Sequence, residues 1–236
     1  TTTKEFGQYI DQYTIEQAVA DGATLQILYE GREAHTKVVG DSLDALFDEY
    51  FEDKTPEEKN EIKKKYGTKN AVLEAPKRIE WVSRDLVKHF KEKIQPNGFK
   101  VMIVTSSRKA AATYKEKLDG NKNAPESAVI ISGDHNDPPE IAKWTNSKEH
   151  ENLIKRFKKP MSEDPLSILI VKDMLLTGFD APICQVMYLD RQLKDHSLLQ
   201  AIARVNRTNK NKFRGYIVDY FGLSDYLTEA LEMFSS

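Results

Sequence analysis

The stretch SILIVKDMLLTGFDAPICQVMYLD, residues 167–190, indicates the fold of this chain. It contains two apolar runs, 167–173 and 184–190, joined by a loop that includes Gly178 and Pro182. Both runs are continuously apolar rather than alternating, which is typical of strands that are covered on both faces. The stretch therefore predicts two buried strands of a parallel sheet.

Similar patterns lie on both sides of this stretch. Three further strand candidates share its apolar, β-branched character: 100–106, 127–133 and 215–222. Helical patterns separate the strands: 108–118, a segment around 148–159 and a helix from Ser197 onward. Because strands alternate with helices, we predict an α/β fold with a parallel, doubly wound sheet and helices on both faces. In such sheets, ligands gather at the carboxyl ends of the strands.

The first 98 residues follow a different pattern. Residues 25–39 are compatible with two short strands about a turn at Gly31. Helical patterns dominate the rest: 13–22, the strongly charged 41–67 with a second helix start at Thr55-Pro56, and 75–94. We interpret this region as additions to the sheet rather than as a separate catalytic domain.

The chain is accordingly divided into three parts. Residues 1–40 are expected to form an entry segment, and residues 41–98 a helical insertion packed beside the sheet. Residues 99–236 are expected to form the sheet domain. The chain lacks an initiator methionine, which suggests an excised piece of a longer protein.

Composition narrows the class of protein. The 236 residues are 39% hydrophobic and 31% charged, which predicts a soluble protein with a core. The 35 Lys and Arg are balanced by 37 Asp and Glu, so a nucleic-acid surface would have to be a local patch. The single cysteine, Cys184, excludes an internal disulfide and fits a reducing compartment such as the cytoplasm. No apolar run approaches the roughly 18 residues of a membrane span, so no membrane partner is expected.

The segment QAIARVNR, residues 200–207, carries two arginines on one helical face. At about 100° per residue, Gln200, Arg204 and Arg207 fall together, opposite the apolar residues of the same helix. No acidic residue within the helix can pair with either arginine. One interpretation is a solvated face in which Gln200 is the capping-box partner of Ser197. The other is a pair of guanidinium groups that binds a phosphate.

The segment DMLLTGFDAP, residues 173–182, follows a predicted strand directly. We therefore expect Asp180 at the carboxyl end of that strand, where it could accept a hydroxyl hydrogen bond or orient an arginine. The alternative is a loop acid that caps its own turn. If this loop and the arginine helix end on the same rim of the sheet, they can converge on one phosphate-bearing ligand.

These two segments, with a third, resemble motifs of superfamily-two helicases. QAIARVNR is similar to the last helicase motif, Gln-x-x-Gly-Arg-x-Gly-Arg, with alanine and asparagine in place of its glycines. DMLLTGFDAP is similar to the preceding motif at Asp173, Gly178, Asp180 and Pro182. KVMIVTSSRKAA, residues 100–111, resembles the strand-to-helix motif that opens the second motor domain. The resemblance implies a RecA-like second motor domain.

A narrower resemblance is to the motor (R) subunit of type I restriction enzymes. It rests on LLTGFDAP, YLDRQLKDHSLLQAIARVNR and GYIVDYFG, and on FGQYIDQYTIEQAVADG at the start. The resemblance implies part of an ATP-dependent DNA translocase within a type I site-specific deoxyribonuclease. The implied partners are double-stranded DNA, the N-terminal motor and nuclease domains of the same chain, and the modification and specificity subunits. ATP and Mg²⁺ would be bound mainly by the N-terminal motor domain.

The resemblance also implies roles for individual residues. Arg204 and Arg207 would be catalytic, with Arg207 as the arginine finger on the γ-phosphate and Arg204 beside it. Gln200 and Asp180 would contact the nucleotide or its attacking water, and Gly178 would shape the loop.

Three further residues are expected at the nucleic acid. Ser106 and Thr177 would touch its backbone, and Lys172 stands where many helicases carry a threonine. The alternative for the two hydroxyls is a structural one, since a hydroxyl at a strand end often caps a helix.

Missing motifs set limits on this interpretation. The chain contains no Gly-x-x-x-x-Gly-Lys-Ser/Thr loop, no suitable Asp-Glu box and no nuclease centre, and its histidines are scattered without metal-ligand spacing. We therefore expect half of a motor, inactive alone and without a metal site. The alternatives are the second motor domain of another superfamily-two helicase and a non-catalytic α/β docking module whose arginines bind partner carboxylates.

Five cations follow one another closely near the arginine helix: Arg204, Arg207, Lys210, Lys212 and Arg214. They would suit DNA phosphates, in which case binding would be salt-sensitive. Alternatively, they form a solvated helix end, where cations favour the helix dipole. The sequence leaves both interpretations open.

Overall fold

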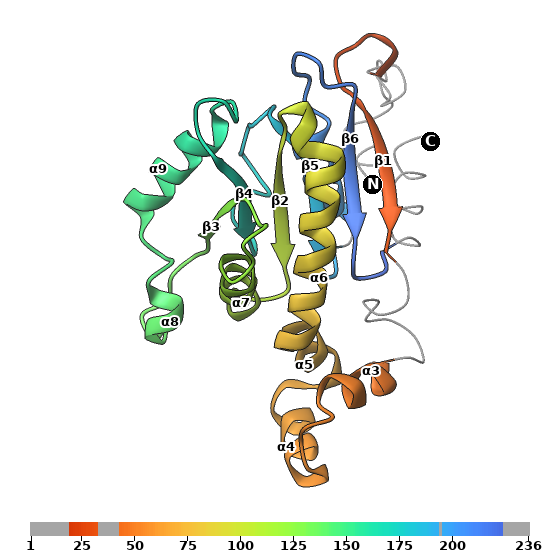
Figure 1. The fold of residues 1–236 in the computed structure, drawn as a ribbon, viewed down its shortest axis with the longest axis vertical. Coiled ribbons are helices and arrows are strands. Elements are labelled where there is room, and N and C mark those ends of the chain that lie inside the picture. Colours follow the sequence, from red (N-terminus) through yellow and green to blue (C-terminus); the bar gives the residue numbers. More distant parts are fainter. Residues whose placement is uncertain (1–18, 33–42, 194, 224–236) are drawn as a thin grey trace, which may run out of the picture.

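The computed structural model of the protein describes residues 19–32, 43–193 and 195–223 (Figure 1). The predicted helix over 13–22 and the second of the two strands predicted within 25–39 fall mostly outside these ranges. Where the chain enters the described region, Gly22 donates to the carbonyl of Val19 with a φ of +71°. This is the left-handed conformation in which glycine commonly ends a helix.

Six parallel strands form one sheet: β1 Gln26–Gly31, β2 Lys100–Thr105, β3 Glu126–Ile130, β4 Leu166–Val171, β5 Cys184–Asp190 and β6 Arg214–Asp219. Their order is β1-β6-β5-β2-β4-β3, and every neighbouring pair is parallel. All residues of β2, β4 and β5 are buried, as their continuous apolar character predicts. The predicted α/β fold with a parallel sheet is confirmed.

Strand β1 joins the sheet from far away in the sequence. It pairs with β6 in a register that runs from Gln26 opposite Arg214 to Gly31 opposite Asp219. The sequence predicts a strand at this position but not its partner, because the two strands are nearly 190 residues apart and no local pattern encodes their pairing.

The helices are α3 Leu43–Tyr50, α4 Pro56–Tyr66, α5 Thr68–Glu74, α6 Pro76–His89, α7 Arg108–Asp119, α8 Pro139–Ala142, α9 Ser147–Lys158 and α10 Asp195–Val205. Helix α4 begins as predicted, with Thr55 and Glu58 forming a capping box and Pro56 in the first turn. Helix α6 continues into a π-helical turn, Phe90–Ile94, and ends before Gly98, whose φ is +76°. The long helix predicted over 75–94 is therefore confirmed.

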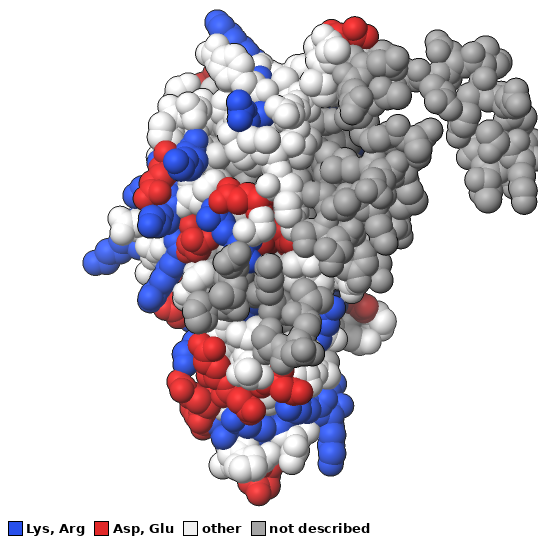
Figure 2. Space-filling model, turned by 90° about the vertical axis from the view of Figure 1, so that its right-hand side faces the viewer, with Lys and Arg blue, Asp and Glu red and all other residues white. Residues whose placement is uncertain are grey.

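The helical segment before β2 has two parts. Helix α6 packs along the sheet, whereas α3, α4 and α5 lie beyond the carboxyl ends of the strands (Figure 1). Acidic and basic side chains lie next to one another over this end of the molecule (Figure 2). Exposed pairs such as Lys59–Asp48 and Lys63–Asp44, both at 2.9 Å, join α4 to α3. This surface therefore has mixed charge.

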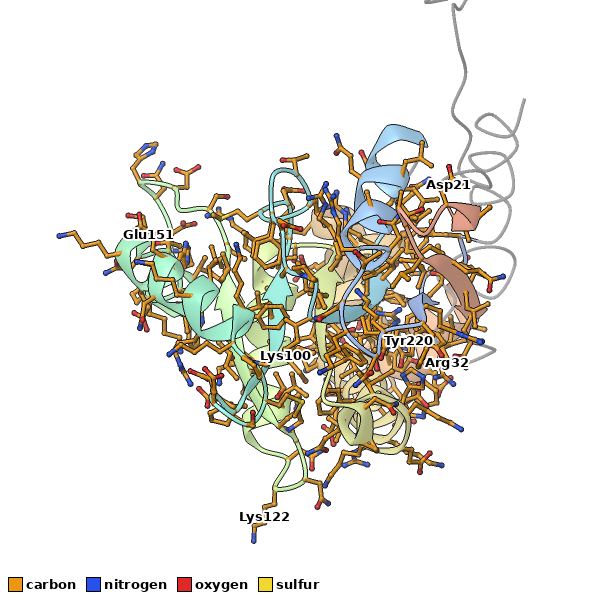
Figure 3. The ribbon with its side chains drawn as sticks, turned by 90° about the horizontal axis from the view of Figure 1, so that it is seen from above. Asp21, Arg32, Lys100, Lys122, Glu151 and Tyr220 are labelled. Atoms are coloured by element: carbon orange, nitrogen blue, oxygen red, sulfur yellow. The ribbon has the colours of Figure 1, made fainter. Side chains whose placement is uncertain are left out.

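Helices cover both faces of the sheet. Along the strand order, the connections from β1 to β2 and from β2 to β3 run toward the edge formed by β3. The connections from β3 to β4 and from β5 to β6 run in the opposite direction, toward β1. Because crossovers between parallel strands are right-handed, the two sets of helices lie on opposite faces. Figure 3 shows α6 on one side of the sheet and α10 on the other. The doubly wound arrangement is therefore confirmed.

Candidate functional site

The two motif segments meet at the amino-terminal edge of the sheet. The loop 172–183 leaves the carboxyl end of β4 and crosses the height of the sheet, so that Ile183 accepts a hydrogen bond from the amide of Lys100 at the start of β2 (3.0 Å). The arginine helix α10 ends at the same edge, where Asn206 accepts from the amide of Leu25, just before β1 (2.9 Å). Figure 3 views the molecule from this edge and labels Lys100.

The predicted position of Asp180 at the carboxyl rim is therefore wrong. The loop and the arginine helix do share a rim, but it is the opposite one. Both segments connect parallel strands, so each must carry the chain back to the edge where the next strand begins. Helix α10 has 11 residues and spans about 16 Å, which is close to the roughly 20 Å of a six-residue strand. Its C-terminal arginines are thus carried to the amino edge.

The predicted arginine pair contacts the predicted loop. The Nη1 of Arg204 donates to the carbonyl of Phe179 at 2.5 Å, and its Nε donates to the carbonyl of Gln200 at 3.2 Å. The Nε of Arg207 lies 3.6 Å from Oδ1 of Asp180. Four of the predicted residues, Gly178, Asp180, Arg204 and Arg207, therefore lie together, and Gln200 lies one helical turn earlier.

The two arginines differ in freedom. Arg204 is partly buried, and burial, reinforced by the nearby charge of Arg207, lowers its pKa, while Asp180 opposes the shift. The side chain of Arg207 is 50% exposed and that of Asp180 is 63% exposed. An exposed pair at this distance is worth only about 0–1 kcal/mol. Arg204 is thus held in place by the loop, whereas Arg207 is available to a ligand.

The loop itself is shaped by one glycine and one buried aromatic ring. Gly178 has a φ of +68°, a conformation that glycine adopts without strain. Phe179 is buried against Phe157 of α9, with ring centroids 6.2 Å apart. Thr177 and Asp180, on either side of this anchor, are exposed. The buried Phe179 ring therefore fixes the loop, and the polar side chains of Thr177 and Asp180 face solvent.

Two predicted nucleic-acid residues lie at the other edge. Ser106 follows β2, and its buried hydroxyl has no hydrogen-bond partner. Lys172 follows β4 and pairs with Asp173 at 2.9 Å. Arg191, which sequence reasoning missed, donates to the carbonyl of Lys172 (2.9 Å) and to Asp173 (2.5 Å). The predicted nucleic-acid set is thus divided, with Thr177 in the loop that runs between the edges.

The start of α10 rules out the predicted capping role of Gln200 and leaves the interpretation as a solvated face open. The helix begins at Asp195, two residues before Ser197. Ser197 is therefore inside the first turn and cannot be the N-cap whose partner is Gln200. The capping-box interpretation is wrong, because local sequence marks helix starts only to within a few residues.

A second residue that sequence reasoning did not place at the site is Lys212. Its side chain is buried at 4% exposure, and its ammonium donates to the carbonyls of Pro182 (2.9 Å) and Cys184 (2.7 Å). It thereby ties the turn after α10 to the end of the Asp180 loop. Burial lowers the pKa of Lys212 to about 8.

Replacing Lys212 with methionine is expected to remove a pH dependence of stability. Between pH 8 and 10.5 the unfolded chain binds a proton at Lys212 that the folded chain has lost, so wild-type stability rises with pH, by up to about 3 kcal/mol. Urea unfolding of both proteins at pH 7.5 and pH 10 measures this. If the free energy of unfolding changes equally in both proteins between the two pH values, Lys212 is not the source of the pH dependence.

Two absences hold for the part of the chain that the structure describes. Among these residues, no group of three or more His, Cys, Asp or Glu side chains is arranged to hold a metal ion. No helix in the same ranges is long and apolar enough to cross a membrane.

Residues 86–221, more than half of the chain, match the family model described as type I restriction enzyme subunit R domain 3. The chain belongs to this R subunit family. Residues 1–60 of this R subunit chain also match the model of the SWI2/SNF2 ATPase. The chain thus corresponds to the R subunit region that is homologous to the second motor domain.

Individual R subunits agree with the family match. The chain is 40% identical to a protein of Methanocaldococcus jannaschii named as the MjaIXP type I restriction endonuclease subunit, over 98% of the chain and 22% of that protein. It is 37% identical to the HindI endonuclease subunit of Haemophilus influenzae, over 100% of the chain and 23% of that protein. The chain therefore spans about a fifth of the length of these relatives.

Solved structures support the fold. A fragment described as an HsdR subunit of a type I restriction enzyme from Vibrio vulnificus YJ016 matches with a TM-score of 0.60 and 19% identity, over 95% of the chain and 38% of the fragment. The type ISP restriction-modification enzyme LlaBIII bound to DNA matches with a TM-score of 0.51 and 11% identity, over 91% of the chain and 13% of that enzyme.

Proposed function

We propose that this R subunit chain is the second motor domain of an ATP-dependent DNA translocase and supplies the second half of its ATP site. ATP and Mg²⁺ would be bound mainly by a first motor domain outside this chain. The observation that carries the proposal is the convergence of Arg204 and Arg207 with Asp180 on one solvent-facing edge of the sheet.

The geometry favours Arg207 as the arginine finger. A finger must leave its resting contacts and stabilise charge that develops on phosphoryl oxygens. The contact of Arg207 with Asp180 is long and exposed, so a phosphate can replace it at little cost. Arg204, which is hydrogen-bonded to the Phe179 carbonyl, would hold the loop in place and help to position the charge of Arg207.

The remaining residues of this edge would complete the nucleotide contacts. Asp180 would accept a hydrogen bond from a nucleotide hydroxyl or hold the attacking water once Arg207 has moved to the phosphate. Gln200, on the same face of α10, would share this role. Gly178 would keep the loop in the left-handed turn that exposes Asp180.

Duplex DNA would follow the carboxyl edge. Ser106 and Lys172 lie there, and the part-exposed Lys172 ammonium, which pairs with Asp173, could bind a DNA phosphate instead. Thr177 would extend this track along the loop. ATP and DNA would then contact opposite ends of the same strands, so that cleft closure on ATP moves the DNA contacts with the sheet as one rigid unit.

The other proposed partners follow from the R subunit family. They are the N-terminal motor and nuclease domains of the same polypeptide, and the modification and specificity subunits of a cytoplasmic restriction complex. The relatives named as endonuclease subunits, which are four to five times longer than this chain, support this assembly. The restriction activity would therefore belong to the whole complex.

The test of the proposal uses the full-length subunit assembled with its partner subunits. The double variant Arg204→Ala/Arg207→Ala is expected to lose both DNA-stimulated ATP hydrolysis and DNA translocation, measured by displacement of a third DNA strand. Lys122→Ala is the control, because Figure 3 places this exposed lysine far from α10. Normal hydrolysis by the double variant would reject the motor assignment.

A further inference from the structure

The turn that follows α10 exposes an aromatic ring at the edge of the proposed ATP site. Phe213 is 80% exposed, twice the exposure of Trp81, the other exposed large hydrophobic side chain of the described residues. Burying a phenylalanine side chain completely stabilises a fold by about as much free energy as burying an aliphatic side chain. Single exposed hydrophobic side chains are common on protein surfaces, so the surroundings of Phe213 decide whether its exposure indicates a ligand contact.

The order of two neighbouring residues makes this exposure unusual. Lys212 and Phe213 are the last two residues before β6, which begins at Arg214, and their side chains differ sharply in burial. Lys212 points inward and is 4% exposed, and Phe213 points outward. The reverse order would bury the ring and leave the charge in water, which the hydrophobic effect and the cost of burying charge both favour. Folding stability alone thus does not explain the order.

The surrounding chain holds this arrangement rigidly. The Lys212 ammonium is bonded to two carbonyls, and its amide closes a turn onto the carbonyl of Asn209 (3.0 Å). Beyond the ring, the side-chain amide of Gln185 donates to the carbonyl of Arg214 (3.3 Å). The ring is therefore carried on a turn that is fixed at both ends.

This turn lies close to the arginines. A Cβ added to Gly215 would lie only 2.4 Å from the carbonyl oxygen of Val205, so the start of β6 passes directly beside the end of α10. Phe213 is two residues from Gly215, and Arg207 is two residues from Val205. At no more than about 3.6 Å per residue, both positions are within about 7 Å of this contact along the chain. The backbones of Phe213 and Arg207 therefore lie within about 14 Å of each other plus the width of this contact, on the same edge of the sheet.

The charge around the ring favours an anionic ligand with a planar group. Between Arg204 and Arg214 the chain carries five cations and no acid. Arg207, Lys210 and Arg214 are exposed. Cations bind phosphates, and an exposed aromatic face stacks on a nucleobase. A nucleoside triphosphate provides both groups in one molecule.

We propose that Phe213 stacks on the base of the bound nucleotide, so that this domain contacts both the phosphate end and the base end of ATP. The inference rests on the proposed function, because it requires the nucleotide to lie against this edge. Stacking on a ring is tolerant of base identity. Phe213 would therefore increase affinity for nucleotides in general and would not select adenine.

The experiment compares two ligands with the full-length subunit in its complex: the non-hydrolysable analogue AMP-PNP, and inorganic tripolyphosphate, which has no base. Phe213→Ala is expected to weaken AMP-PNP binding about fivefold to a hundredfold, the range for loss of one base–aromatic stack, and to leave tripolyphosphate binding unchanged. Phe213→Trp is expected to restore AMP-PNP binding. Trp81→Ala, which removes an exposed ring elsewhere, is expected to change neither.

Three results would overturn the inference: unchanged AMP-PNP affinity, equal weakening for both ligands, or a loss confined to DNA binding, which would assign the turn to DNA. None of them affects the proposed function, which depends on the arginine variants and their rates of hydrolysis. Conversely, if the double arginine variant hydrolyses ATP normally, the motor assignment fails whatever Phe213→Ala does.

Discussion

Replacing Arg207 with alanine in the full-length, assembled subunit is expected to lower the rate of DNA-stimulated ATP hydrolysis by at least about a hundredfold, with little change in ATP affinity. An arginine finger acts mainly on charge that develops in the transition state, so its loss affects kcat rather than binding. The half-exposed side chain and the long contact with Asp180 make Arg207 the arginine that is free to act in this way.

Two further variants distinguish the positive charge of Arg207 from the geometry of the site. Arg207→Lys keeps a positive charge but loses the planar fork of donors, so it is expected to remain strongly impaired. Arg204→Ala is expected to lower the rate of ATP hydrolysis and to make the Asp180 loop less ordered, because Arg204 donates a hydrogen bond to the Phe179 carbonyl of that loop. A normal rate for Arg207→Ala together with a large loss for Arg204→Ala would exchange the two roles. Normal rates for both would show that the helix face is only solvated.

Replacing Arg78 with methionine is expected to reduce the free energy of unfolding by about 3–5 kcal/mol, the usual cost of removing one partner of a buried ion pair. Arg78 of α6 and Asp190 at the end of β5 are 0% and 1% exposed and are joined by two hydrogen bonds of 2.9 and 2.6 Å. Tyr114 of α7 donates to the same carboxylate at 2.6 Å. Without Arg78, the charge of Asp190 stays buried with only neutral donors.

The matched control lies on the same helix. Arg84 is 74% exposed and pairs with Glu80 at 2.5 Å, so Arg84→Ala is expected to cost less than about 1 kcal/mol. The double variant Arg78→Met/Asp190→Leu is expected to recover part of the loss, since it removes the unpaired charge. Denaturant unfolding measures all three variants. A loss for Arg78→Met no larger than that for Arg84→Ala would mean that the pair does not join α6 to the sheet.

The Arg78–Asp190 pair also shows how the helical segment relates to the sheet. The two residues are 112 positions apart, and Arg78 donates in addition to the carbonyl of Tyr220, just after β6. The sequence interpretation treats 41–98 as an insertion packed beside the sheet. The structure shows that α6 contributes a buried charge to the sheet's carboxyl edge, so the longest helix of this segment is part of the core.

The positions of strands and helices were predictable because their signals are local. The buried strands β2, β4 and β5 are apolar runs, α4 starts at a capping box, and α6 ends near a glycine with positive φ. Each of these features depends on residues a few positions apart. The grouping of Arg204 and Arg207 on one face of α10 was predictable for the same reason.

Local sequence patterns were enough to predict that strands alternate with helices, that the sheet is parallel and buried, and that two arginines share a helix face near a glycine-containing acidic loop. The three-dimensional arrangement was needed to show that these groups meet at the amino edge, that β1 completes the sheet, and that Lys212 is buried while Phe213 is exposed. This difference follows from the range over which each kind of interaction acts. Periodicity and capping act within a few residues, whereas strand pairing, crossover length and buried hydrogen bonds join residues tens to hundreds of positions apart.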